Sequence, residues 1–281
     1  FASGREYSEF ADLNKLGAIV TKTVTLKERK GNLPPRICET PSGMLNAIGL
    51  QNKGVEYFLA DDLPFLRKFD VPVIANVAGD TLEEYVEVSK RLSEAKVDGI
   101  ELNISCPNVK KGGMVFGTNS EMAAEVVRAV KKVINVALII KLTPNVTDIA
   151  EIAKSVEKAG ADAISLINTP LGMAVDIETF EPELANITGG LSGPAIKPLA
   201  VRMVWQVSKA VKVPVIGMGG IMNASDAIEF FLVGASAVAV GTANFIHPTA
   251  TINIIEGIEE FLKKKSFKSV SEIVGKLRFS V

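Results

Sequence analysis

The sequence predicts a single α/β domain over residues 1–281, built as a (β/α)8 barrel, and three observations point to this fold. Short apolar segments alternate with amphipathic helical segments along most of the chain. The apolar segments lack a polar face, which is typical of parallel strands that helices cover on both sides. Glycines and polar residues follow several of these segments, and barrel enzymes build their active sites at the carboxyl ends of their strands.

Seven parallel strands are predicted, at residues 18–21, 71–76, 99–103, 137–142, 163–168, 213–218 and 237–240. A closed barrel of this type has one strand more. The chain instead opens with a helix-like segment at residues 6–16. We therefore expect the first strand of the barrel to be missing from the N-terminus of this sequence. An open seven-stranded sheet is the alternative.

Helical segments are predicted between the strands and after the last one. They cover residues 82–95, 119–134, 148–159, 198–211 and 224–233, with two terminal helices at 252–265 and 270–277. Asp148 and Asn223 stand at the start of two of these segments, where short polar side chains cap the first backbone N–H groups. Residues 26–52 and 171–194 interrupt the repeat, and we expect both to be long loops that cover or build the active site.

Composition narrows the classes of function. The chain has 31 Lys+Arg against 32 Asp+Glu, and this balance argues against a nucleic-acid-binding protein. No apolar run reaches the ~20 residues that cross a bilayer, and charges near the start argue against a signal peptide. The two cysteines give no disulfide framework, so we expect a cytoplasmic protein. They are also too few for the ~4 thiolates that hold an iron–sulfur cluster.

The most informative segment is Asn103–Asn108, which directly ends the predicted strand at residues 99–103. Pro107 cannot continue a strand, because it has no N–H to donate. Cys106 is therefore expected at the rim of the sheet, where a thiolate can act as a general base. The one histidine, His247, is expected to serve packing or capping. A free cysteine can also be buried and inert, so a structural role for Cys106 stays open.

Amide side chains recur at comparable places. They are Asn46 in the first long loop, Asn103 and Asn108 around the cysteine, and Asn168, which is followed by Thr169 at the end of a strand. An amide offers both donors and an acceptor, so several of them together suit a flat ligand with alternating C=O and N–H groups. Singly, each asparagine is more often a turn or cap residue.

Two lysines, Lys22 and Lys141, end otherwise apolar strands. We expect their ammonium groups to point into the mouth of the barrel, where an anionic ligand would offset the cost of burying them. An obvious use is to stabilise negative charge on a reduced cofactor ring. The alternative is that each lysine extends to solvent along its apolar stem.

Glycines follow the last two predicted strands, at Gly217–Gly220 and at Gly241. Phosphate sites of these barrels commonly lie in the loops after strands seven and eight, where backbone N–H groups approach the oxygens. We therefore expect a phosphate site there. Tight turns without a ligand are the alternative.

Two longer segments together resemble the dihydroorotate dehydrogenase family of class 1. They are residues 103–118, which contain the asparagines and the cysteine, and residues 189–198, Gly-Gly-Leu-Ser-Gly-Pro-Ala-Ile-Lys-Pro. The cysteine at position 106 resembles class 1, because class 2 enzymes carry serine there. Lys110–Met114 and Gly172–Asp176 resemble the catalytic subunit of class 1B. The resemblance runs over essentially the whole chain.

The resemblance implies that the barrel binds FMN and oxidises dihydroorotate to orotate in pyrimidine synthesis, with Cys106 as the general base. It implies that substrate is bound by Lys22, Asn46, Asn103, Asn108, Asn168 and Thr169. It also implies that FMN is bound by Lys22, Thr23, Asn103, Lys141, Ile167, Gly193, Gly219, Gly220, Gly241 and Thr242. No metal site is expected in this chain.

The resemblance to class 1B further implies a homodimer that joins an electron-transfer subunit into a heterotetramer. That subunit would carry FAD and a [2Fe–2S] cluster and would reduce NAD⁺. Three alternatives stay open: a class 1A-type fumarate-linked enzyme, another flavin barrel that acts on a dihydropyrimidine or dihydrouridine, and an aldolase or isomerase barrel that uses Lys22 or Lys141 as a Schiff-base amine. A non-catalytic scaffold is disfavoured by the polar rim.

Overall fold

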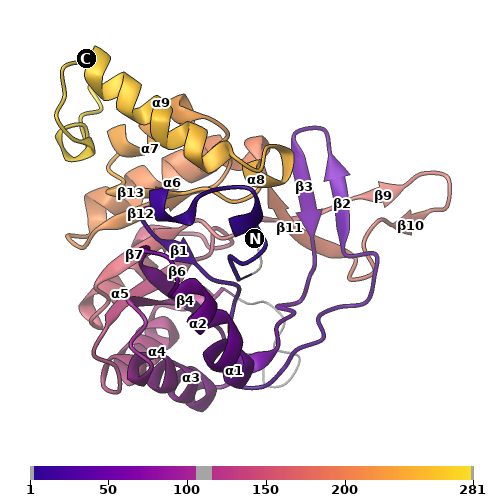
Figure 1. The fold of residues 1–281 in the computed structure, drawn as a ribbon. Helices are drawn as coiled ribbons and strands as arrows, with labels where there is room; N and C mark the ends of the chain where they lie inside the picture. The colour runs from indigo at the N-terminus through magenta and orange to yellow at the C-terminus, as the bar shows by residue number, and fades with distance from the viewer. Residues whose placement is uncertain (1–2, 106–115, 280–281) are drawn as a thin grey trace.

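The computed structural model describes residues 3–105 and 116–279. Its main sheet has seven parallel strands in the order β1-β4-β5-β6-β7-β12-β13 (Figure 1). Their bounds are Ile19–Val20, Val73–Val77, Gly99–Asn103, Ala137–Leu142, Ala163–Leu166, Val215–Met218 and Ala237–Ala239. The predicted parallel strands are thus confirmed, with ends that shift by no more than a few residues.

Five helices cover the outer side of this sheet. They are α3 (Leu82–Glu94), α4 (Ser120–Lys131), α5 (Ile149–Lys158), α6 (Lys197–Ala210) and α7 (Ala224–Leu232), and each packs on its neighbours in order. Their apolar faces meet the outward strand residues in one core, which explains why the strands are apolar on both faces. The arrangement confirms an α/β barrel-like fold. Within the described residues β1 and β13 are the edge strands, and a (β/α)8 barrel whose first strand is missing from this sequence stays a prediction.

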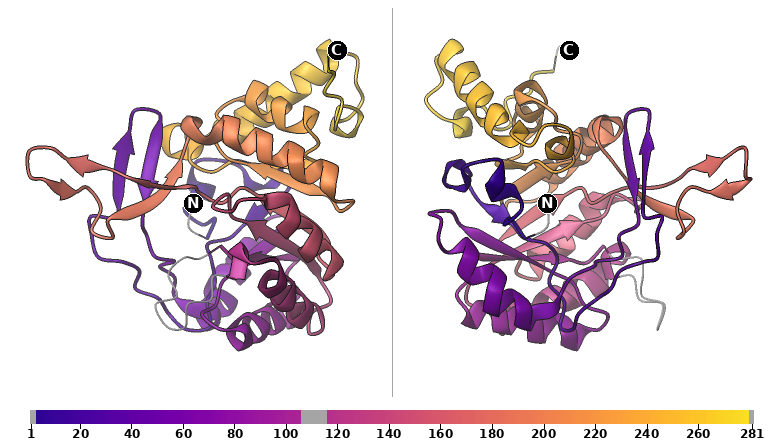
Figure 2. Two further views of the ribbon diagram at one scale, coloured as in Figure 1. Left: turned by 180° about the vertical axis from the view of Figure 1, so that it is seen from behind. Right: turned by 45° about the vertical axis from the view of Figure 1, so that its right-hand side comes forward.

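Residues 26–52 and 171–194 interrupt the strand–helix repeat as predicted, but the prediction that they are loops throughout was wrong. They form a four-stranded antiparallel sheet in the order β2-β3-β11-β8, with bounds Ile37–Thr40, Gly43–Asn46, Thr188–Ser192 and Leu171–Met173. A hairpin of β9 (Val175–Asp176) and β10 (Glu181–Pro182) continues from it. Both project from the barrel in all three views (Figures 1 and 2). These strands are short, and β3 pairs with a β11 far along the chain, so no local periodicity marks them.

Other helical predictions need correction near the two ends. Residues 6–16 form two short 3₁₀ turns, Tyr7–Glu9 and Leu13–Lys15, because the Asp12 side chain accepts from the Asn14 N–H and interrupts a continuous helix. A helical segment that had not been predicted runs through α1 (Gly54–Tyr57), η3 (Phe58–Asp62) and α2 (Leu63–Leu66).

At the carboxyl-terminal end, the short helix α8 (Ala243–Ile246) precedes α9 (Ala250–Lys264). Helix α9 confirms the terminal helix predicted at residues 252–265. The second predicted terminal helix is only a 3₁₀ turn, Val270–Glu272, before Gly275 adopts φ +71°. Two further 3₁₀ turns in the described part of the chain are Phe116–Thr118 and Pro194–Ile196. No helix among residues 3–105 and 116–279 is long and apolar enough to cross a membrane.

Candidate active site

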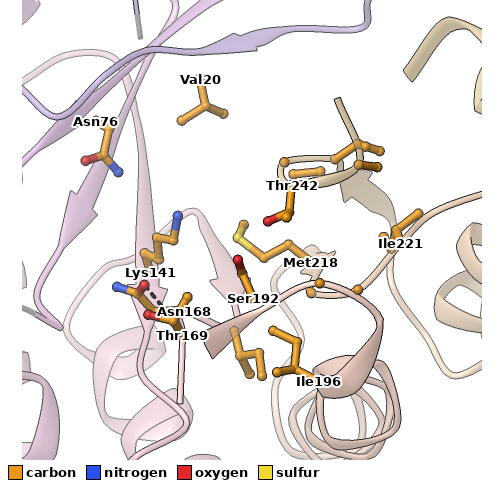
Figure 3. A pocket seen from close by; sticks show the side chains of 18 of the residues that line it. Val20, Asn76, Lys141, Asn168, Thr169, Ser192, Ile196, Met218, Ile221 and Thr242 are labelled. Atoms are coloured by element: carbon orange, nitrogen blue, oxygen red, sulfur yellow. Dashed lines mark hydrogen bonds between the residues drawn. The ribbon is translucent and has the colours of Figure 1, made fainter. Parts of the chain in front are cut away.

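A cavity of about 370 Å³ opens at the carboxyl ends of the barrel strands, a size within the range of small-molecule sites. It is lined by most of the predicted site residues, namely Lys22, Thr23, Asn103, Lys141, Ile167, Asn168, Thr169, Gly193, Gly219, Gly220, Gly241 and Thr242. Figure 3 shows Lys141, Met218 and Thr242 reaching the cavity from different sides. Parallel strands place their carboxyl ends at one edge, which brings these distant residues together.

Three of the predicted residues are not among those named above, for two different reasons. Cys106 and Asn108 lie outside the described residues, although Asn103 and Ser105 lead toward them from the end of β5. Asn46 lies in β3, where it pairs with Ile37 and Gly190, and it does not line the cavity. The roles predicted for these three residues therefore stay predictions.

Two asparagine side chains that line the cavity are hydrogen-bonded to each other. Asn168 Nδ2 donates to Asn103 Oδ1 at 3.2 Å, and Asn168 Oδ1 accepts from the Thr169 N–H at 2.8 Å. The backbone carbonyl of Asn103 also accepts from the Tyr85 hydroxyl at 2.7 Å, which anchors the strand end to α3. Asn103 is 8% exposed. The hydrogen bonds thus fix the orientation of both amides, and a ligand meets donors and acceptors that are already placed.

The floor of the cavity carries a polar network centred on three residues that had not been predicted, Asn76, Glu101 and Ser165. Glu101 is buried, and its Oε2 accepts from Asn76 Nδ2 at 2.5 Å while its Oε1 accepts from Ser165 Oγ at 2.6 Å. Thr23 Oγ1 donates to Asn76 Oδ1 at 2.6 Å. Lys141 Nζ lies 3.7 Å from Glu101 Oε2. The sequence did offer one sign of this network, because Glu101 is a carboxylate within the otherwise apolar strand Gly99–Asn103.

Lys22 is the second cation of the cavity. Burial, and then the positive charge of Arg36, lower the pKa of the Lys22 ammonium. Within the described part of the chain, no carboxylate forms an ion pair with Lys22, in contrast to Lys141. An anionic ligand would therefore be stabilised strongly beside Lys22.

The glycine loops leave room and donors for a ligand. Gly193, Gly219 and Gly220 have φ values of +98°, +124° and +74°, which favour glycine. A Cβ added at Gly241 would meet no atom within 4 Å, so the cavity lies directly over its backbone. The N–H groups of Gly219, Gly220, Gly241 and Thr242 donate to no acceptor in the described residues. This set of open donors fits an anionic phosphate.

Cys38 lies in β2 and does not line the cavity. Burial, and then the carboxylates of Glu183 and Glu39, raise the pKa of its thiol, so it is not activated as a nucleophile or base. No group of three or more His, Cys, Asp or Glu side chains among the described residues could hold a metal ion.

A curled parallel sheet with a polar cavity at its carboxyl ends defines this chain as an α/β-barrel enzyme. The family model of dihydroorotate dehydrogenase matches residues 1–262. Relatives named "Dihydroorotate dehydrogenase B (NAD(+)), catalytic subunit" are 60% identical in Alkaliphilus oremlandii and in Alkaliphilus metalliredigens, each over 99% of this chain and 92% of the relative. That of Anoxybacillus flavithermus is also 60% identical, over 98% and 89%. The chain belongs to the dihydroorotate dehydrogenase family.

Proposed function

We propose that this chain is the catalytic subunit of an NAD⁺-linked dihydroorotate dehydrogenase that oxidises (S)-dihydroorotate to orotate in pyrimidine biosynthesis. The observation that carries the proposal is full-length identity of 60% to catalytic subunits of that name. A cavity at the strand ends, where lysines and amides converge, supports it.

The family is flavin-dependent, and we infer that the flavin of this chain is FMN. Its single phosphate matches the open N–H donors of Gly219, Gly220, Gly241 and Thr242, with Gly193 beside them. Lys22, Thr23, Asn103, Lys141 and Ile167 would hold the ring, since all of them line the same cavity. When bound there, the flavin would supply the hydride acceptor for the oxidation.

The roles proposed for the substrate-binding residues follow from the charges and hydrogen-bonding groups of their side chains. Lys22 would pair with the substrate carboxylate, which would offset the cost of burying its charge. Asn103, Asn168 and Thr169 would bind the C=O and N–H groups of the ring, because their amides are held in place. Asn46 and Asn108 are proposed as further substrate ligands, through the resemblance alone.

Cys106 is proposed as the general base. Its thiolate would take the proton from C5 while the hydride leaves C6, so the substrate loses two electrons and two hydrogens and gains a C=C bond. The thiol that results must return its proton to water before the next turnover.

The electrons must then leave the chain. Its two cysteines are too few for an iron–sulfur cluster of its own. We infer that a partner subunit with FAD and a [2Fe–2S] cluster passes them to NAD⁺. A homodimer joined to that subunit in a heterotetramer, and a cytoplasmic location, are parts of the same proposal.

An anaerobic visible spectrum of the purified protein, taken before and after dihydroorotate is added, tests the function. We expect an oxidised-flavin spectrum that bleaches upon addition. A flavin spectrum that does not bleach would contradict the proposed substrate and favour another dihydropyrimidine. Folded protein that neither retains nor takes up flavin would contradict the redox function and favour the aldolase-type alternative.

A further inference from the structure

The inside of this barrel departs from the usual packing. Inward-facing strand positions of such barrels are mostly filled by bulky branched apolar side chains. Here four consecutive strands, β4 to β7, place polar side chains together, namely Asn76, Glu101, Lys141 and Ser165. A polar layer of this kind costs stability unless every group has a partner. Its presence directly under the cavity therefore needs a functional explanation.

Glu101 is the centre of this layer. It is 1% exposed, and each of its oxygens accepts one short hydrogen bond, from Asn76 and from Ser165. Neither of these donors is charged, so they fix the carboxylate without neutralising it. A fully buried carboxylate is stabilised most strongly by a cation beside it. Among the described residues that cation is Lys141.

The spacing between Glu101 and Lys141 is informative. Nζ lies 3.7 Å from Oε2, which is close enough for ionic attraction but too long for a hydrogen bond. Lys141 makes no side-chain hydrogen bond within the described residues, and its side chain is 21% exposed in the cavity. Its ammonium thus keeps its N–H donors for whatever binds above it.

We propose that Glu101 is a positioning residue, whose carboxylate, held by two hydrogen bonds, fixes the Lys141 side chain in the cavity and so sets how tightly this site binds the electron-rich edge of a flavin ring. The proposal rests on the flavin site proposed above. The hydrogen bonds that hold Glu101 continue to a second residue of the cavity lining, because Asn76 Oδ1 accepts a hydrogen bond from Thr23 Oγ1.

A double-mutant cycle tests whether Glu101 acts through Lys141. The four proteins are the wild type, Glu101→Gln, Lys141→Met and the double variant, each prepared with FMN. The dissociation constant of FMN is measured from the flavin fluorescence that appears as the holoprotein is diluted. We expect Glu101→Gln to weaken binding about tenfold when Lys141 is present, and less than about twofold in the Lys141→Met background.

The outcomes separate the possible roles. Equal weakening in both backgrounds, or no weakening beside Lys141, would overturn the positioning role. A wild type that binds no flavin would contradict the proposed function itself, and this inference with it. Melting temperatures of all four proteins show whether each variant is folded.

Acylation of lysines by acetic anhydride gives a readout that needs no flavin. The rate of modification at Lys141, followed by peptide mass spectrometry, reports how firmly Glu101 holds the lysine side chain. We expect Glu101→Gln, which removes the ionic partner of Lys141, to raise that rate at least about tenfold relative to the rate at Lys154. Ser165→Ala is the matched control, because it loosens the carboxylate but keeps the charge. Equal acceleration in both variants would mean structural loosening and would contradict the proposal.

Discussion

At the scale of single residues, the two lysines of the cavity differ in how their charge is stabilised. Lys141 lies beside the buried carboxylate of Glu101, whereas burial and Arg36 lower the pKa of Lys22. An ammonium that is buried without a counter-ion destabilises the folded chain. Such a cost is expected where a residue is kept to bind an anionic ligand.

The first prediction concerns Lys22. Because its pKa is lower in the folded than in the unfolded chain, the unfolded chain binds more protons between the two values, and this residue makes stability rise with pH in that interval. Lys22→Met should therefore raise the melting temperature at pH 7 by about 2–4 °C. The gain should shrink as the pH approaches 10.5, the ordinary pKa of a lysine side chain.

Thermal unfolding without substrate at pH 7 and pH 10 checks this prediction. Lys27→Met is the matched control, because Lys27 is exposed, so the same change of side chain is made there without altering a buried site. A Lys22→Met protein that is less stable than the wild type at pH 7 would contradict the prediction, because the buried ammonium would then not destabilise the folded state.

The second prediction concerns Cys106. If its thiolate is the general base, Cys106→Ser should lower turnover at neutral pH by about 10²–10⁴-fold, because a serine hydroxyl is a far weaker base. The visible flavin spectrum should persist. Steady-state oxidation of dihydroorotate measures the effect, with Cys38→Ser as the control that should retain activity. Near-normal turnover of Cys106→Ser would remove Cys106 as the base.

At the scale of elements, the loops after β12 and β13 combine two kinds of glycine. Gly220 has a positive φ, and a Cβ there would lie 2.8 Å from the carbonyl oxygen of Gly193 and from the N of Lys197. Gly241 has open space instead. The first glycine is thus required by the backbone, whereas the second leaves access to a ligand.

The third prediction separates these two glycines. Gly220→Ala should lower the free energy of unfolding by about 1–3 kcal/mol, because the added methyl is strained in that conformation. Gly241→Ala should leave stability unchanged but weaken FMN binding by about tenfold or more, because its methyl occupies the approach to the backbone N–H groups. Denaturant unfolding and flavin fluorescence measure the two effects. Unchanged FMN affinity in Gly241→Ala would place the phosphate elsewhere.

At the scale of the whole molecule, one large core joins the sheet to its helices, and a small second core of Leu45, Ala47 and Leu184 lies under the antiparallel sheet. The barrel carries the cavity, and the chain has too few cysteines to carry a cluster. Electron transfer to NAD⁺ is therefore expected to depend on a second protein.

The fourth prediction is that the isolated chain reduces NAD⁺ slowly or not at all with dihydroorotate as donor. A dye that takes electrons directly from flavin should be reduced readily, which serves as the positive control. Absorbance at the NADH band measures the reaction. Rapid NAD⁺ reduction by this chain alone would contradict the need for a partner.

Local sequence patterns were sufficient for the strand–helix alternation and for much of the site. Residues such as Lys141 and Asn168 could be assigned to one rim because parallel strands end at the same edge of a sheet. Asn76 and Glu101 were missed, because both lie within apolar strands and only their partners on neighbouring strands show what they do.

The sequence by itself determined the periodic strands, the helices between them and the polar residues at the strand ends, since each of these depends on residues close together in the chain. The tertiary structure alone decided the antiparallel sheet, in which β3 pairs with β11, and the contact of Glu101 with Lys141. Both depend on which distant segments lie side by side, and that is set by packing of the whole chain rather than by local propensity.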